Sequence, residues 1–215
     1  LVCGAGEPVG AALVAAPHVA GVCFTGSTMV AKTINRALAK KDGPIVPLIA
    51  ETGGMNAMIV DSSALLEQAC DDIITSAFGS AGQRCSSLRL LFVQQEVAQH
   101  LCELLMGAMD ELRVGDTQHL TSDIGPVIDR DAQQKLLAHV AAMKQVARFS
   151  HACAIPSEAV EVRVALGASP QGGGLGAMPP SENHFVPPTL LGLDSPAQLT
   201  EEMFGPILHV FSYKA

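Results

Sequence analysis

The sequence predicts an α/β fold built on an open, mostly parallel sheet with flanking helices. Short apolar runs alternate with longer segments of helical periodicity along the chain. The apolar runs end in glycine or acidic turn residues, such as Gly53-Gly54 and Asp61, as buried strands do in such folds. Hydrophobic residues make up 48% of the 215 positions, which is enough for a sizeable core in one large domain or two small ones.

Composition excludes several classes of function. The net charge of −8 and the lack of a basic patch argue against nucleic-acid binding. No apolar run is long enough to span a membrane, and no secretory signal is present. The six cysteines form no CxxC pair and suit a reducing cytoplasm, and no His/Cys cluster has zinc spacing, so we expect no metal. Because Leu1 reads as the middle of a strand, we also expect the chain to be a piece of a larger polypeptide.

The first quarter of the chain predicts a short βαβ-like arrangement. A short helix is expected near 9–14, after a GxGxxxG spacing that is only a weak dinucleotide signal. A buried strand over 19–24 contains Cys23, and residues 25–28 form a turn and helix N-cap. The remaining elements are a helix over 29–39 and a buried strand over 45–50.

The rest of the chain continues the alternation of strands and helices. One helix is expected to bury Leu65, Ala69, Ile73 and Ala77 on one face. The Gly/Pro-rich segment 156–180 predicts a mobile surface loop, partly built on a hairpin, to which we assign no function. The expected strands are 56–60, 88–93, 185–191 and one within 201–211, and the expected helices are 65–78, 97–112 and 131–147.

The octet 80–87 is the strongest candidate for a catalytic loop. Small residues surround Cys85, and they let a ligand approach the backbone closely. A thiolate there could attack a substrate carbon, while neighbouring backbone N–H groups stabilise an oxyanion. The alternative is a buried structural cysteine, which is a common use of the residue.

Glu51 is the candidate general base. It follows the apolar run 45–50 and precedes Gly53-Gly54, so it is expected at the carboxyl end of a strand, where α/β folds bind ligands. A carboxylate backed by apolar residues can act as a base. The alternative is a surface glutamate at a strand exit.

Four motifs, in this order and spacing, resemble those of the aldehyde dehydrogenase superfamily. They are 24–28 (FTGST), 51–54 (ETGG), 82–85 (GQRC) and 202–206 (EMFGP). The amino-acid sequences of segments 45–54, 80–86 and 184–190 most resemble those of one group of family members. These members oxidise L-glutamate-γ-semialdehyde, formed from 1-pyrroline-5-carboxylate, to L-glutamate in proline catabolism. The resemblance covers nearly the whole chain and is weakest over 147–183.

The resemblance implies two domains and an NAD cofactor. Residues 1–52 would be the tail of a Rossmann-like NAD-binding domain, and residues 53–215 a catalytic domain that is incomplete at its C-terminal end. Cys85 would attack the aldehyde, and Glu51 would activate the water that hydrolyses the thioester. The other implied contacts are Ser86 with substrate, Gly26 and Ser27 with the pyrophosphate, Glu202 with the nicotinamide ribose, and Phe204 with the nicotinamide.

It also implies partners that lie outside this chain. The remainder of a parent polypeptide would supply a second oxyanion donor, most of the cofactor cradle and a substrate-anchoring segment, so the isolated chain is expected to be inactive. The parent is expected to be a cytoplasmic homo-oligomer, and FAD would belong to a separate domain of it. Alternatives are another NAD(P)-dependent aldehyde dehydrogenase, a cysteine hydrolase or acyltransferase using Cys85, and a non-catalytic structural fragment.

Two of the assigned residues have simpler alternatives, and Arg84 and the remaining cysteines are expected to be structural. Glu202 follows Glu201, and an acidic pair is usually part of a solvated face. Phe204 is expected in a core whatever else it does. Arg84 is expected to hold the cysteine loop in place rather than to bind substrate, and the five other cysteines are expected to be packing residues.

Overall fold

The computed structural model describes residues 1–155 and 184–214. The chain divides into two compact units, Leu1–Gly54 and Met55–Ala215. The predicted loop and hairpin over 156–180 lie outside the described residues. Within the described residues, no helix is long and apolar enough to cross a membrane.

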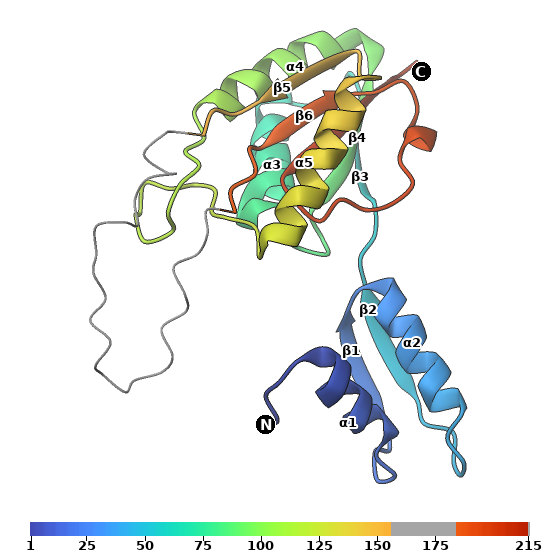
Figure 1. Cartoon of the computed structure of the whole chain (residues 1–215). Helices are drawn as coiled ribbons and strands as arrows, with labels where there is room; N and C mark the ends of the chain where they lie inside the picture. Colours follow the sequence, from blue (N-terminus) through green and yellow to red (C-terminus); the bar gives the residue numbers. More distant parts are fainter. Residues whose placement is uncertain (156–183, 215) are drawn as a thin grey trace, which may run out of the picture. The chain divides into compact units, whose positions relative to one another are not determined.

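Unit 1, Leu1–Gly54, is a two-stranded parallel sheet with short helices (Figure 1). The helix predicted over 29–39 is confirmed, because α2 begins at Thr28 and ends at Ala39. The side-chain oxygen of Ser27 accepts a hydrogen bond from the Val30 N–H at 3.2 Å, which confirms the predicted N-cap. The elements are η1 (Gly6–Gly10), α1 (Ala11–Ala15), β1 (Val22–Gly26), α2 (Thr28–Ala39) and β2 (Leu48–Thr52).

The prediction that both strands of unit 1 are buried is wrong. Cys23 in β1 is exposed, and so is Ile49 in β2, with 62% of its surface accessible. Both strands also begin three residues later than predicted, and β2 ends at Thr52 instead of residue 50, so that Glu51 lies inside β2 rather than after it. A sheet of two strands offers its side chains few neighbours, so apolar composition alone does not bury them.

Unit 2, Met55–Ala215, contains a five-stranded sheet in the order β3-β4-β7-β6-β5. All neighbouring strands are parallel except β5, which pairs antiparallel with β6, so the predicted open, mostly parallel sheet is confirmed. The elements are β3 (Asn56–Val60), α3 (Leu66–Phe78), η2 (Gly79–Gly82), β4 (Leu88–Gln94), α4 (Gln95–Asp110), α5 (Arg130–Lys144), β5 (Phe149–Ala152), β6 (Thr189–Gly192), η3 (Pro196–Gln198) and β7 (Ile207–Tyr213).

Helices cover both faces of the unit 2 sheet (Figure 1). Neighbouring residues of β7 show the two faces, because side chains alternate along a strand. His209 contacts His139 of α5, whereas Val210 lines a hollow beside α4. The core on these two faces includes the fully buried side chains of Ile73, Leu91 and Ile207. This two-sided burial explains why β4 and β7 read as nearly continuous apolar runs.

Several element boundaries in unit 2 differ from the prediction. Leu65 precedes α3 and is 68% exposed, so it does not share the buried face of Ile73 and Ala77. The strand predicted from residue 185 begins only at Thr189, because Pro187 and Pro188 have no N–H for a ladder. The short edge strand β5 was not predicted at all.

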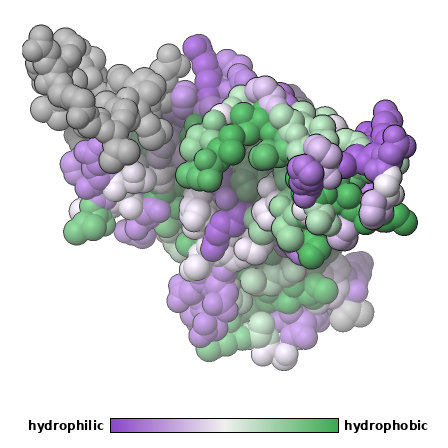
Figure 2. Space-filling view, turned by 90° about the horizontal axis from the view of Figure 1, so that it is seen from below, coloured by the Kyte–Doolittle hydropathy of each residue, from purple (hydrophilic) through white to green (hydrophobic). Residues whose placement is uncertain are grey.

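Polar and apolar side chains mix on the molecular surface. Figure 2, which shows one face, has apolar residues that reach the surface among hydrophilic ones. Large apolar side chains that are more than half exposed occur in both units, for example Met29 and Ile45 in unit 1 and Ile59 and Ile128 in unit 2.

Candidate active site

Cys85 lies in a tight turn between η2 and β4. The Ser87 N–H donates to the Arg84 carbonyl at 3.1 Å, which places Cys85 and Ser86 at the tip of the turn. The Asn56 side-chain amide donates to the carbonyls of Cys85 at 2.7 Å and Ser87 at 2.9 Å. Both Cys85 and Ser86 are exposed. The turn therefore presents the thiol to solvent while its carbonyls are held on the protein side.

A left-handed stretch of backbone leads into this turn. Ser80, Ala81 and Gly82 all have positive φ, of 58°, 53° and 65°. Only glycine adopts this conformation without a steric cost, and the third position also has no room for a side chain. A Cβ on Gly82 would lie 2.2 Å from the Gly205 carbonyl oxygen. Gly82 therefore lets the cysteine loop and the 202–206 motif pack backbone against backbone.

Two side chains of the GQRC motif hold the loop in place. The amide of Gln83 donates to the Pro126 carbonyl at 3.3 Å, and its oxygen accepts from the Ile128 N–H at 2.8 Å. Arg84 donates to the carbonyls of Thr75 at 2.9 Å and Ser76 at 3.3 Å, near the end of α3. The prediction that Arg84 holds the loop in place is therefore confirmed.

Glu202 and Phe204 stand on the segment that contacts the loop. One carboxylate oxygen of Glu202, Oε1, accepts from Arg89 Nη2 at 3.1 Å, and the Glu202 side chain is only 18% exposed. The reading of Glu202 as part of a solvated acidic face is therefore wrong; Glu201 alone is exposed, in an ion pair with Lys135. Phe204 is 47% exposed, so the expectation of a core residue is also wrong. Its ring lies beside the Arg89 guanidinium.

These residues gather at the amino ends of the parallel strands in unit 2. The cysteine loop precedes β4, residues 202–206 precede β7, and these two strands are paired neighbours. Asn56, which supports the turn, is the first residue of β3. The usual rule for α/β sheets places ligands at the carboxyl ends. Here that rule describes the position of Glu51 near the end of β2 but not that of Cys85.

The remaining predicted site residues belong to unit 1. Glu51 is exposed on β2, and it lies opposite Thr25 in the ladder with β1. Gly26 ends β1, and Ser27 caps α2 directly after it. A Cβ on Gly26 would lie 2.5 Å from the ring of Phe24, so only glycine fits without moving that ring. Unit 1 thus combines the candidate base with a capped helix start, which is suited to a phosphate.

The other cysteines divide into two groups. Burial raises the pKa of the Cys70 and Cys102 thiols, and it raises that of Cys153 to about 11. These three thiols are therefore poor nucleophiles at neutral pH. Cys3 and Cys23 are exposed, so the expectation that all five are packing residues is wrong for these two.

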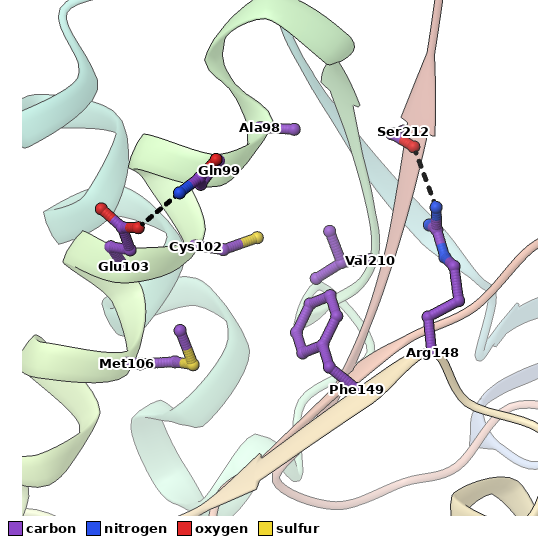
Figure 3. Close-up of a pocket in the computed structure, with 9 residues that line it drawn as sticks. All are labelled: Ala98, Gln99, Cys102, Glu103, Met106, Arg148, Phe149, Val210 and Ser212. Atoms are coloured by element: carbon purple, nitrogen blue, oxygen red, sulfur yellow. Dashed lines mark hydrogen bonds between the residues drawn. The ribbon is translucent and has the colours of Figure 1, made fainter.

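A separate apolar hollow lies on the α4 face of the sheet. Its volume is about 300 Å³. Figure 3 shows the side chains that line it. Arg148 at its rim already donates to Ser212 Oγ at 3.3 Å and to the Leu193 carbonyl at 2.9 Å. None of the predicted site residues lines it. The lining residues are Ala98, Gln99, Cys102, Glu103, Met106, Arg148, Phe149, Val210 and Ser212.

The described residues contain neither a metal cluster nor a histidine partner for the candidate nucleophile. In residues 1–155 and 184–214, no three His, Cys, Asp or Glu side chains gather as metal ligands would. Cys85 Sγ makes no hydrogen bond to a histidine in the same part of the chain. His209 is buried and lies three positions after the 202–206 motif. It pairs with His139 instead, at 2.9 Å between the two Nε2 atoms.

Comparisons with known proteins identify the family of the chain. The sequence pattern of the aldehyde dehydrogenase family matches residues 1–215, and the chain belongs to this family. It is 48% identical over 213 residues to the bifunctional protein PutA of Klebsiella aerogenes and 47% identical to that of Escherichia coli. These alignments cover 98% of this chain and 15% of each relative, so the chain spans about a seventh of their length.

Solved structures give the same result. A crystal structure of a bifunctional proline utilization A (PutA) protein superimposes with a TM-score of 0.84 at 53% identity, covering 98% of this chain and 19% of that one. The 1-pyrroline-5-carboxylate dehydrogenase from Thermus with bound NAD gives a TM-score of 0.78 at 28% identity, covering 99% of this chain and 37% of that one. The fold of the chain is therefore the aldehyde dehydrogenase fold.

Proposed function

We propose that this chain carries the nucleophile and the deacylating base of an NAD-dependent L-glutamate-γ-semialdehyde dehydrogenase of proline catabolism. The observation that supports it most strongly is the position of Cys85, which is exposed at the tip of a turn. Hydrogen bonds from the side chains of Asn56, Gln83 and Arg84 hold this turn in place. The substrate follows from the similarity to PutA and 1-pyrroline-5-carboxylate dehydrogenase proteins.

The first chemical step uses only groups of this loop. The Cys85 thiolate adds to the aldehyde carbon, and the carbonyl oxygen becomes an oxyanion. The Cys85 N–H donates no hydrogen bond within the described part of the chain, so it can donate to that oxygen. Ser86 is exposed beside Cys85, which supports its assignment as a substrate contact.

Each unit carries residues that suit one part of a dinucleotide. Within residues 1–155 and 184–214, the second carboxylate oxygen of Glu202, Oε2, has no donor, so it can accept hydrogen bonds from ribose hydroxyls. The half-exposed ring of Phe204 offers a face for a nicotinamide. Gly26 and Ser27 at the start of α2 suit a pyrophosphate. NAD, when bound, accepts the hydride from the substrate carbon.

Glu51 is assigned to the last step. Transfer of the hydride leaves a thioester on Cys85. Glu51 takes a proton from a water molecule, the water oxygen attacks the thioester carbon, and the carbon–sulfur bond breaks to release the carboxylate product and the thiol. Its exposed position on β2 leaves the carboxylate accessible to water.

The decisive test is replacement of the nucleophile in the natural protein that carries these residues. Cys85→Ala is expected to abolish NADH formation from glutamate semialdehyde, because no thiohemiacetal can form. Cys102→Ala, in a thiol whose pKa is raised by burial, is the matched control and is expected to retain turnover. Undiminished turnover in Cys85→Ala would remove the nucleophile assignment.

A second variant tests the base. Glu51→Gln is expected to form the thioester but to hydrolyse it slowly, so a stopped-flow trace should show a burst of NADH followed by turnover at least about 100-fold slower. Loss of the burst itself would place Glu51 in an earlier step. Glu7→Gln, another exposed glutamate of unit 1, serves as the control.

A cysteine hydrolase or acyltransferase stays the alternative of a different class. It needs an imidazole base at Cys85, and no described histidine hydrogen-bonds to that thiol. Ester hydrolysis without any dependence on NAD would favour it. Self-association of the whole protein and a cytoplasmic location stay predictions, as does the inactivity of the 215-residue chain alone, which calorimetry with NAD and an NADH absorbance assay would test.

A further inference from the structure

Arg89 is the one charged residue among the largest fully buried side chains of the described structure. It stands at the start of β4, four positions after Cys85, and is 1% exposed. Burying a guanidinium is costly unless its donors are satisfied, and desolvation lowers the pKa of Arg89 from its usual range. An isolated guanidinium would not be stable there, so the partners of Arg89 explain its position.

The partners of Arg89 come from two separate segments. Nη2 donates to the Arg84 carbonyl at 3.2 Å, which is the carbonyl that closes the Cys85 turn. Nη1 donates to the Gly205 carbonyl at 3.0 Å. Nε and Nη2 both reach Oε1 of Glu202, at 3.3 and 3.1 Å. The same guanidinium lies 5.5 Å from the centroid of the Phe204 ring.

From these contacts we infer that Arg89 is a positioning residue that couples the Cys85 loop to the dinucleotide-binding residues Glu202 and Phe204. This inference rests on the proposed function. The guanidinium of Arg89 holds Oε1 of Glu202, which leaves Oε2 for a ligand, and it holds the carbonyl of the nucleophile turn at the same time. A lysine could neutralise Glu202 but could not reach all three acceptors from one point charge.

The first measurement is NAD affinity by calorimetry in the natural protein that carries these residues. Arg89→Met and Glu202→Gln are each expected to weaken NAD binding by about 10-fold or more, as loss of a hydrogen bond to a charged group does. The double variant is expected to lose less affinity than the sum of the two single losses, because part of the effect of Arg89 acts through Glu202. Additive losses would overturn the inference.

The second measurement needs no cofactor. Hydrogen exchange should show that Arg89→Met loosens the segments 84–88 and 202–207 together, because one side chain holds both. Arg148→Met is the control: it removes an arginine whose partners are Leu193, Asp194 and Ser212, and it should affect residues 192–195 and 212 but not 84–88. Equal loosening of 84–88 in that control would contradict the inference.

Arg89→Lys separates charge from geometry and provides a variant expected to fold if Arg89→Met does not. It should recover part of the NAD affinity and little of the exchange protection of 84–88. Full recovery of both would show that charge alone matters and would overturn the positioning role. If the unmodified protein binds no NAD, the proposed function fails, while the exchange experiment still tests the coupling of the two segments.

Discussion

The two units of the chain bury their apolar residues to very different extents. In unit 1, only Val14, Ala31 and Leu38 are buried, and the strands expose Cys23 and Ile49. In unit 2, a continuous core runs between the sheet and the helices on both of its faces. Both units combine parallel strands with helices, so the kinds of element present do not explain the difference. A strand is buried only when other elements cover both of its faces, and unit 1 has few such elements.

The difference bears directly on the proposed chemistry. The nucleophile loop is fixed by side chains of unit 2 that are themselves buried, such as Arg89. The candidate base, Glu51, stands on an exposed strand of unit 1. Exposed apolar strands favour contact with further protein surface. We therefore expect the order of the Cys85 turn to be intrinsic to unit 2, and the order around Glu51 to depend on what covers unit 1.

The largest expected effect tests this comparison with one substitution in each unit. Ile207→Ala removes a fully buried side chain from β7 and should destabilise unit 2 by about 4 kcal/mol. Ile49→Ala, on an exposed strand, should cost less than about 1 kcal/mol. Urea unfolding of the chain, followed by hydrogen exchange in each unit, measures both. A cost for Ile49→Ala close to that of Ile207→Ala would mean that unit 1 is packed as well as unit 2.

Part of this contrast could be read from the sequence and part could not. The helix over 29–39 and the strand over 56–60 follow from periodicity and capping, which are local properties. The burial of 45–50 was predicted wrongly, because an apolar run shows what a strand would bury and not whether anything covers it. The edge strand β5 escaped prediction because it is short and partly polar, and its pairing is decided by β6.

The candidate site shows the same division between local and long-range information. Cys85 and Ser27 could be placed from their motifs, since a loop of small residues and an N-cap are local features. Arg89 was visible only as the single charge in an apolar run. Its role depends on Glu202 and Gly205, more than a hundred positions away, so no local pattern could indicate it.

A buried histidine pair gives unit 2 a predicted dependence on pH. Burial, followed by the neighbouring His139 and the charge of Arg89, lowers the pKa of His209 to about 4, although the hydrogen bond between His209 and the Arg89 carbonyl acts in the opposite direction. Burial also lowers the pKa of His139, with Glu201 raising it and Lys135 lowering it. An unfolded histidine titrates near 6.5, so between about pH 6.5 and pH 4 the unfolded chain binds more protons.

Stability of unit 2 should therefore fall as the pH drops through this range. For His209 alone the loss at pH 5 relative to pH 7 is about 2 kcal/mol, because 1.4 kcal/mol corresponds to one pKa unit. Urea unfolding at both pH values measures it. His209→Gln should flatten the dependence, and His100→Gln, in an exposed histidine of α4, should not. Unchanged pH dependence in His209→Gln would assign the effect to other groups.

The smallest expected effects come from two serines, one in each unit, and they should have opposite signs. Ser27 is exposed, yet its Oγ caps α2 by accepting from the Val30 N–H, so Ser27→Ala should cost about 1 kcal/mol and Ser27→Asp should restore the cap.

Ser87 is fully buried, and its Oγ has no partner within the described residues. Removing a buried hydroxyl that makes no hydrogen bond relieves a desolvation cost, so Ser87→Ala should stabilise unit 2 by up to about 1 kcal/mol. Hydrogen exchange of the α2 amides reports the first change, and urea unfolding of unit 2 reports the second. If Ser87→Ala instead destabilised unit 2, its hydroxyl would have to be satisfied in solution by water.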